Sequence, residues 1–111
     1  MRTIEREICN VIESGKDGCD RRVSERDRVW KTEGSTLVFL HNTKIVQIAE
    51  GKMQLFARGW RSATTKSRLN AMLRNFAPQW RIVQKNFDWK VYNSKTGEVK
   101  EFEDGIEFTI A

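Results

Sequence analysis

The first periodic segment of the chain is an apolar stripe at helical spacing. Its side chains stand at positions i, i+4, i+7 and i+8: Ile4, Ile8, Val11 and Ile12. Such a stripe is typical of an amphipathic helix, and we predict one over residues 2–14. Thr3 is the expected N-cap, because its hydroxyl accepts a hydrogen bond from a free N–H of the first turn. Gly15 is expected to end the helix.

The pattern then changes to short runs that are typical of strands. Residues 19–28 are dense in charge and predict either a loop or a short helical turn from Ser24. Beyond them, β-branched and aromatic residues predict strands over residues 28–32, 36–41, 44–49 and 53–57. Turns as short as Glu50-Gly51-Lys52 separate these strands. Such turns favour an antiparallel meander.

Helical spacing returns in the middle of the chain. Residues 66–76 place four apolar side chains on one face: Leu69, Met72, Leu73 and Phe76. We predict a helix there, capped by Thr64 or Thr65 and followed by Pro78. Turn-like segments rich in Asn, Gly, Asp and Lys divide the remainder into four predicted strands, over residues 80–84, 88–92, 99–102 and 106–110.

This order of elements predicts an α+β fold with mainly antiparallel sheet, an N-terminal helix and one central helix. No linker divides the 111 residues, so we expect a single domain over residues 1–111. The composition, with 39% apolar and 32% charged residues, excludes a disordered chain. No run approaches the ~18 apolar residues of a membrane helix, and the charged N-terminus lacks a secretory core. We therefore expect a cytoplasmic protein that does not bind membranes.

Motifs of catalysis and cofactor binding are missing from the sequence. Two cysteines and one histidine, Cys9, Cys19 and His41, show none of the spacings of a zinc site. Neither a P-loop nor a dinucleotide-binding glycine motif is present. We expect no cofactor, no metal and no enzymatic activity. Cys9 is expected to be apolar core of the first helix, and Cys19 to be an exposed thiol.

The net charge of +5 is unevenly distributed. Residues 1–51 are neutral, and the C-terminal residues 91–111 are acidic. Residues 52–90 hold nine Lys and Arg residues and a single carboxylate, Asp88. Such a basic segment supplies the phosphate-neutralising term of nucleic-acid binding. The alternative is ordinary surface charge that faces the acidic C-terminal end.

A phosphate site is predicted where this basic segment enters the central helix. Free N–H groups at a helix N-terminus favour anions, and aromatic side chains among cations stack on single-stranded bases. Trp60 is the one tryptophan that we expect to be exposed, and the other three are assigned to the core. The candidate nucleic-acid-binding residues are Arg58, Trp60, Arg61, Thr65, Lys66, Arg68, Arg74, Arg81 and Lys85.

Two observations oppose this site. A threonine at a helix start is often only a cap, with neighbouring Lys and Arg side chains extended into water. In addition, Lys66, Arg68 and Arg74 point in three directions around an ideal helix, so the helix alone does not build one basic face.

Three segments of the sequence carry a resemblance to known proteins. They are Thr64–Leu73, Ile82–Trp89 and Glu101–Gly105. Their order and spacing over about residues 59–110 resemble small uncharacterised proteins of phages and prophages, and the first helix lies outside the resemblance. It implies a viral accessory protein that acts on host machinery in the host cytoplasm. It implies no chemistry and assigns no functional residues.

Two functions remain open. The first is phosphate-led, weakly sequence-specific binding of DNA or RNA through the basic segment. The alternative is a protein-binding inhibitor that blocks a host protein or defence complex, in the manner of anti-CRISPR proteins. The inhibitor would use an exposed sheet edge, which could also form a homodimer. It could also use the acidic C-terminal residues Glu98, Glu101, Glu103, Asp104 and Glu107.

Overall fold

The computed structural model describes residues 1–110, and they form an α+β fold, as the sequence predicts. A first helix precedes five strands, and a second helix precedes four more: α1 (Thr3–Ser14), β1 (Asp20–Arg22), β2 (Asp27–Thr32), β3 (Ser35–Leu40), β4 (Thr43–Ala49), β5 (Lys52–Leu55), α2 (Ala63–Phe76), β6 (Trp80–Lys85), β7 (Asp88–Asn93), β8 (Val99–Glu101) and β9 (Ile106–Thr109).

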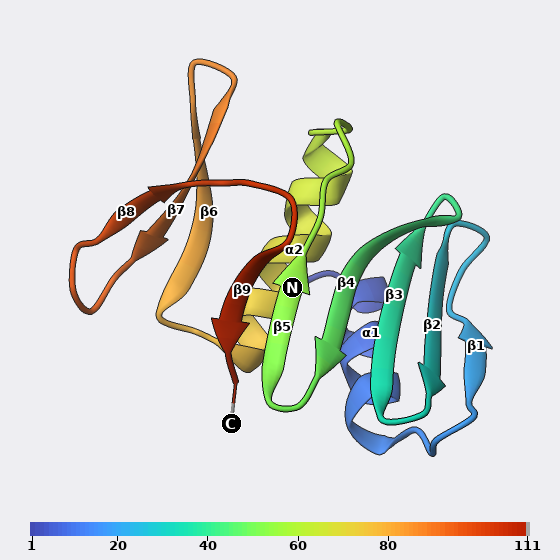
Figure 1. Cartoon of the computed structure of the whole chain (residues 1–111). Helices are drawn as coiled ribbons and strands as arrows, with labels where there is room; N and C mark the ends of the chain where they lie inside the picture. The colour runs from blue at the N-terminus through green and yellow to red at the C-terminus, as the bar shows by residue number, and fades with distance from the viewer. Residues whose placement is uncertain (111) are drawn as a thin grey trace.

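The strands form two antiparallel sheets. The larger sheet has six strands in the order β1-β2-β3-β4-β5-β9, and the smaller has the order β6-β7-β8. After β8 the chain leaves the small sheet. Its last strand, β9, pairs with β5 of the larger sheet, with Met53 opposite Phe108. The C-terminal end of the chain therefore closes the edge that the meander leaves open (Figure 1).

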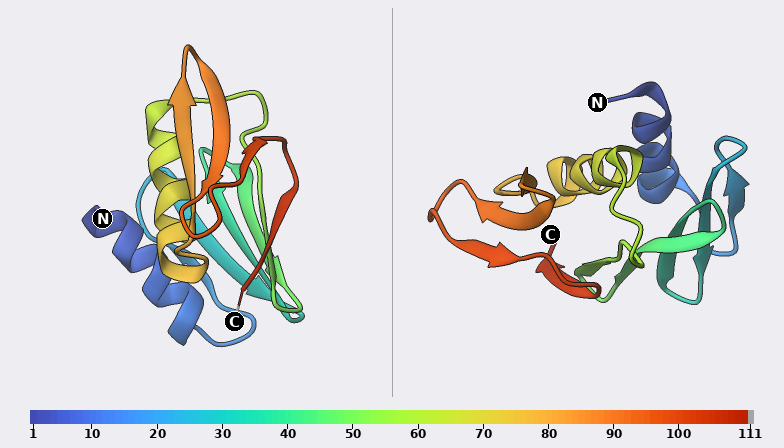
Figure 2. Two further views of the ribbon diagram at one scale, coloured as in Figure 1. Left: turned by 90° about the vertical axis from the view of Figure 1, so that its left-hand side faces the viewer. Right: turned by 90° about the horizontal axis from the view of Figure 1, so that it is seen from above.

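Both helices lie against the same face of the six-stranded sheet. Figure 1 looks onto the opposite face, with α1 and α2 behind the strands, and Figure 2 shows the same layers from the side and from above. The core fills the space between them and includes Ile8 of α1, Val46 and Met53 of the sheet, and Leu69 of α2. No other element of residues 1–110 covers the opposite face of the sheet.

The small sheet is fastened to α2 through the edge of β6. The Asn70 side chain donates to the Ile82 carbonyl at 3.1 Å and accepts from the Ile82 N–H at 2.7 Å. An amide that meets both backbone groups takes the place of a neighbouring strand, because unpaired edge groups otherwise invite pairing with another chain. On the inner face of this sheet, Trp89 packs edge-on against Phe102.

A β-bulge interrupts the pairing of β3 with β4. Val38 lies opposite Val46, but the next residue, Phe39, lies opposite Lys44, so Ile45 is passed over. The extra residue of a bulge changes which side chains reach each face. Ile45 and Val46 are consequently both buried, although they are adjacent in a strand. Lys44 lies beside Phe39 on the uncovered face.

The structure corrects several local expectations. The N-cap of α1 is Arg2 rather than Thr3, and the Glu5 carboxylate accepts the Arg2 backbone N–H. Residues 19–28, predicted as a loop or a short helical turn from Ser24, contain instead the edge strand β1 and the start of β2 at Asp27. The central helix begins at Ala63, three residues earlier than predicted, because Ser62 is its N-cap. Each miss lies in a segment where charged or hydroxyl residues mask the start of an element.

A buried ionic cluster joins three elements of the fold. Arg68 of α2 donates to Asp27 of β2 at 2.8 Å and to Glu5 of α1 at 3.0 Å. Ser67 donates to Glu5 at 2.6 Å, and Ser24 donates to Asp27 at 2.7 Å. Arg68 is only 5% exposed. Its assignment as a phosphate ligand is therefore wrong, because its charge is already satisfied inside the protein.

The cluster also sets the charge state of Glu5. Burial raises the pKa of this carboxyl, but hydrogen bonds from Ser67, the Arg2 backbone and Arg68 outweigh burial. The net pKa lies below the ordinary value of 4.5. A carboxyl whose pKa falls on folding stabilises the folded state above its unfolded pKa. That stabilisation is lost as the pH falls through the folded pKa.

We predict that Arg68→Met lowers the free energy of unfolding by about 3–5 kcal/mol, because two buried carboxylates lose their counter-charge. Urea denaturation at neutral pH measures the change. Arg74→Met is the matched control, since Arg74 is exposed on the same helix, and it should change stability by less than about 0.5 kcal/mol. Equal stability of the Arg68→Met and wild-type proteins would contradict a stabilising role for the cluster.

We also predict that Glu5→Gln flattens the acid dependence of stability. The wild-type free energy of unfolding should decline as the pH falls below the ordinary Glu5 pKa of 4.5. The variant is less stable at neutral pH but lacks this titration, so its decline with acid is shallower. Denaturation curves collected across this pH range compare the two slopes, and parallel slopes would refute the assignment.

Candidate nucleic-acid interface

The residues predicted to bind nucleic acid do not meet on one surface. Three of them lie in the loop between β5 and α2: Arg58, Trp60 and Arg61. Four lie on α2: Thr65, Lys66, Arg68 and Arg74. Two lie on β6: Arg81 and Lys85. These residues are close in the sequence, but they do not form a single basic site in the structure.

The N-terminus of α2 is occupied by its own side chains. Ser62 accepts the Thr65 N–H at 3.1 Å, and the two hydroxyls are 3.0 Å apart. Thr65 is buried, so its assignment as a phosphate ligand is wrong. Lys66 donates to Gln84 at the end of β6 at 2.9 Å. The predicted anion position thus serves as a helix cap and as a contact with the small sheet.

Arg61 makes intramolecular contacts with the small sheet and the segment that follows it. Its guanidinium donates to the Phe102 carbonyl at 3.0 Å and lies 5.6 Å and 5.5 Å from the ring centres of Trp89 and Phe102. A guanidinium over aromatic faces is attracted by their electron density. This arrangement joins the loop before α2 to the small sheet.

The remaining basic residues are exposed and lie on two elements, α2 and β6. Arg81 lies 5.4 Å from the ring centre of Tyr92 on the outer face of the small sheet. Arg74 borders a shallow depression beside Arg2 and Glu5 of the N-terminal region. Lys85 ends β6 and is exposed. Arg81 and Lys85 therefore share the outer face of β6, four residues apart, whereas Arg74 lies on α2.

The uncovered face of the six-stranded sheet brings together residues that the sequence analysis did not connect. Arg28 of β2 lies opposite Phe39 of β3, and Phe39 lies opposite Lys44 of β4. Directly opposed residues share a sheet face. At one end Arg22 lies opposite Arg28, and at the other Lys44 contacts Phe56. We call this line the basic–aromatic row: Arg22, Arg28, Phe39, Lys44, Phe56 and Arg58.

From Arg28 to Arg58, cations and aromatic rings alternate along the basic–aromatic row. The Arg28 guanidinium lies 5.4 Å from the centre of the Phe39 ring and 5.5 Å from that of Trp30, a neighbour on the same face. Lys44 and Arg58 lie 4.9 Å and 4.4 Å from the centre of the Phe56 ring. Such contacts hold each cation close to an apolar ring while both remain accessible to solvent.

The row carries a positive excess. Asp20 accepts two hydrogen bonds from Arg28, both at 2.7 Å. These bonds hold the pKa of the Asp20 carboxyl below its ordinary value. Within the described residues, no carboxylate lies within ion-pair distance of Arg22, Lys44 or Arg58. Arg22 donates to the Glu25 carbonyl at 3.1 Å and Lys44 to the Gln47 side chain at 2.6 Å. Both acceptors are neutral, so the charges of these three cations remain available to an external anion.

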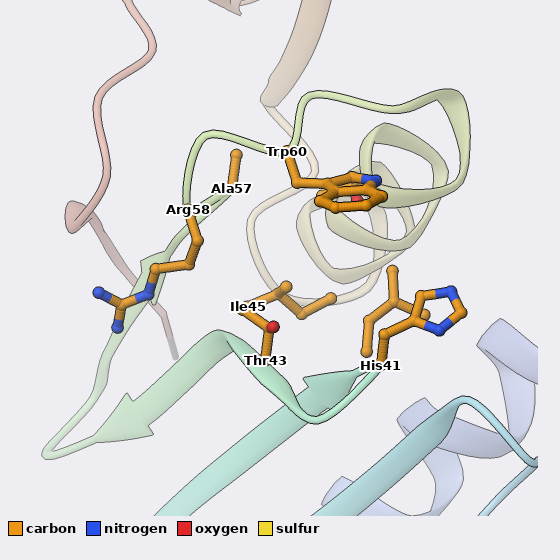
Figure 3. Close-up of a pocket in the computed structure, with 8 residues that line it drawn as sticks. His41, Thr43, Ile45, Ala57, Arg58 and Trp60 are labelled. Carbon is orange, nitrogen blue, oxygen red and sulfur yellow. The ribbon is translucent and has the colours of Figure 1, made fainter.

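A cavity opens at one end of the basic–aromatic row. Its volume is about 360 Å³, and it lies between the β3–β4 turn, the loop before α2 and the start of α2. Eight residues line it: Leu40, His41, Thr43, Ile45, Ala57, Arg58, Trp60 and Thr65. In Figure 3 the Trp60 ring lies across the cavity from Ile45 and His41, and the Arg58 guanidinium points away from it.

The loop that carries Trp60 is held in place by Asp104. The two oxygens of this carboxylate accept the N–H groups of Ala57 at 2.8 Å and Arg58 at 2.9 Å. Arg58 has a φ of 54°, which an L-residue rarely adopts, so the backbone here is under constraint. Asp104 was expected to belong to an acidic docking edge. It serves instead as an internal anchor.

The other C-terminal acidic residues are also partly neutralised. Glu101 is paired with Lys90, Glu98 lies 3.7 Å from Lys100, and Glu107 lies 3.4 Å from Lys52. The predicted acidic surface therefore consists mainly of ion pairs.

The tryptophans divide between interior and surface. Trp60 is 72% exposed and Trp89 is fully buried, as expected. Trp30 differs from its assignment to the core, because it lies on the uncovered face of the sheet and is 36% exposed. Among the described residues, the most exposed large apolar side chain is Phe87, which is 91% exposed at the tip of the β6–β7 hairpin. The sequence pattern around Phe87 indicates only a turn.

A metal-binding cluster does not emerge from the described part of the chain. Residues 1–110 contain no group of three or more His, Cys, Asp or Glu side chains arranged to hold a metal ion. Cys9 is buried and Cys19 is partly buried against the core. Neither helix of the described residues is long and apolar enough to cross a membrane.

The comparisons with known proteins identify one family. The model of a family described as Kyanoviridae Gp96 protein matches residues 1–109. This match includes the first helix, which the resemblance noted in the sequence left outside. No curated protein and no solved structure shows significant similarity to the chain.

We predict that the two thiols differ sharply in reactivity. Burial, reinforced by the negative charges of Glu13 and Glu5, raises the pKa of the Cys9 thiol to about 11. The thiolate is the reactive form, so at pH 8 the folded protein should expose one fast-reacting thiol, Cys19, to a disulfide reagent. Denaturant should release the second. The Cys19→Ser variant should show no fast phase, and a fast phase in that variant would contradict the burial of Cys9.

Proposed function

Because the chain belongs to the Kyanoviridae Gp96 protein family, a family of phage proteins, we propose that it is a non-enzymatic accessory protein that binds single-stranded nucleic acid in the infected cell. The proposed interface is the uncovered face of the six-stranded sheet. It retains only Arg58 of the residues predicted in the sequence analysis for phosphate contact. The observation that carries the proposal is the alternation of cations and aromatic rings in the basic–aromatic row.

This alternation matches the chemistry of a single strand. Unpaired bases stack on aromatic side chains, and the backbone phosphates are neutralised by Lys and Arg. Phe39 and Phe56 supply ring surfaces, and Lys44 and Arg58 lie within 5 Å of the Phe56 ring centre. Five neighbouring strands about 4.8 Å apart give the row a length of roughly 20 Å. That length corresponds to about five or six nucleotides at the stacked rise of 3.4 Å.

The shape of the face favours a single strand over a duplex. The major groove of B-DNA admits a helix or a two-stranded ribbon, whereas this face is six strands wide. A duplex also keeps its bases stacked inside, where Phe39 and Phe56 could not reach them. Phosphate contacts and stacking carry little sequence information. Recognition would consequently be weakly dependent on sequence.

The second candidate is a protein-binding inhibitor of a host protein or defence complex. One observation favours it: Phe87, at a hairpin tip that extends beyond the body of the molecule, is almost fully exposed (Figure 1). An aromatic anchor of this kind is typical of protein interfaces. The surrounding charges, Lys85 and Asp88, have opposite signs and do not select a partner class. The nucleic-acid interface is therefore preferred.

We predict micromolar binding of a fluorescently labelled 12-nucleotide single strand at low salt, with weaker binding of a matched duplex. If Arg22, Lys44 and Arg58 each neutralise one phosphate, log Kobs should fall with log salt concentration with a slope of about −2. Fluorescence anisotropy with oligothymidine and oligouridine measures both quantities.

The matched variants separate the two possible surfaces. Lys44→Gln with Arg58→Gln removes two charges from the row and should weaken binding and lower the salt slope. Lys66→Gln with Arg74→Gln removes two charges from α2 and should leave the slope unchanged. A greater loss of affinity in the α2 double variant would place the binding site in the basic segment, residues 52–90. No binding by the wild-type protein at low salt would overturn the proposed function and favour the protein-binding candidate.

A further inference from the structure

We propose that the cavity beside Trp60 receives one unpaired base of the bound strand, with the base stacked on the Trp60 ring. This inference rests on the proposed function and assigns a separate subsite to it. It is carried by three features: the position of the cavity at the end of the basic–aromatic row, the chemistry of its walls, and the exposure of Trp60.

The cavity and the row are built from the same strands. Phe39 and Lys44 lie on the uncovered face, and their chain neighbours Leu40 and Ile45 line the cavity. The β-bulge causes this division, because it turns Ile45 inward and leaves Lys44 beside Phe39. The row and these cavity walls therefore lie on opposite sides of the sheet, and Arg58, which belongs to the row and also lines the cavity, joins them. A strand that follows the row to Arg58 would reach the cavity by crossing the rim of the sheet at the β3–β4 turn.

The walls of the cavity suit a planar ring with polar edges. Leu40, Ile45 and Ala57 supply buried apolar surface. His41 and Thr43 are exposed at the rim, where an imidazole and a hydroxyl can pair with the edge of a base. The volume of about 360 Å³ lies at the lower end of the range for small-molecule sites, roughly 300–1,000 Å³. One base is therefore the proposed occupant.

Charge complementarity places the phosphate outside. The Arg58 guanidinium points away from the cavity (Figure 3), and it lies 4.4 Å from the centre of the Phe56 ring. A base inserted beside Trp60 would leave its phosphate near this cation, so one residue would link the subsite to the row. An apolar peptide side chain could enter the same walls, but it would gain nothing from the unpaired Arg58.

Trp60 is free to make this contact at little structural cost. Its ring is 72% exposed, and its backbone N–H donates to the Ala57 carbonyl at 2.8 Å. The Asp104 carboxylate fixes the preceding residues, so the ring is presented from a held loop. The backbone contacts do not depend on the indole, and Trp60→Ala should retain the wild-type melting temperature.

The test uses a 12-nucleotide strand that carries one 5-iodouracil, which cross-links on irradiation to an aromatic ring stacked against it. Mass spectrometry of the wild-type complex should place the cross-link at Trp60. Trp60→Ala should remove that cross-link and weaken binding roughly five-fold to a hundred-fold, the range for one stacked base. Thr43→Phe, which fills the cavity from its rim and keeps Trp60, should also remove the cross-link while the salt slope stays unchanged.

The outcomes distinguish this inference from the function on which it rests. Suppose that the wild-type protein binds the strand and that Lys44→Gln with Arg58→Gln weakens binding. If Trp60→Ala then binds normally and cross-links form only at Phe39 or Phe56, the base subsite is overturned and the proposed function stands. If the wild-type protein does not bind, both are overturned.

Discussion

The buried guanidinium of Arg68, held between the carboxylates of Glu5 and Asp27, is the interaction on which the rest of the structure depends. It joins α2 to α1 and to β2, elements that are far apart in the sequence. A buried charge tolerates few positions, because each partner must lie within hydrogen-bond distance. The cluster therefore does more than add stability. It specifies that both helices lie on the same face of the large sheet, and this leaves the other face uncovered.

An uncovered sheet face acquires its chemistry from strand register. Side chains alternate between faces, so a slip of one residue would exchange the core and the surface of a strand. Here the slip occurs once, at the bulge between β3 and β4. Regular pairing would put Ile45 on the uncovered face and turn Lys44 inward. The bulge places Lys44 between Phe39 and Phe56, and it gives the adjoining cavity its Ile45 wall.

Much of the fold was predictable, because the signals for its helices, strands and turns lie within short segments of the sequence. The stripe from Ile4 to Ile12, the run from Leu69 to Phe76, and turns such as Glu50–Gly51 mark elements that the structure contains within a few residues. The antiparallel α+β class follows from their order. The pairing of β9 with β5 was not predictable in this way, because no local signal states which distant edge a strand completes.

The candidate site was harder to predict from the sequence, because net charge was counted over continuous segments of the chain. Arg68 falls in the most basic segment, but its partners Glu5 and Asp27 come from a segment of zero net charge. The same neutral segment supplies Arg22, Arg28 and Lys44, which the register gathers into the row. Net charge along a chain reports attraction to partners only where the side chains share a face. The cross-strand positions of Arg28, Phe39 and Lys44 would have been the informative signal.

Trp60 shows why a prediction from local composition can succeed beside one that fails. A glycine and polar neighbours indicate exposure, and that inference needs no knowledge of distant residues. Its proposed role in binding, however, depends on Asp104, a residue distant in the sequence. The Asp104 carboxylate accepts the backbone N–H groups of Ala57 and Arg58 and so holds the loop. A loop ordered before binding loses less conformational freedom when it engages a ligand. The proposed base subsite thus relies on a carboxylate contact between residues distant in the sequence, as the core does. In the core the carboxylates hold Arg68, and at the subsite Asp104 holds a surface loop.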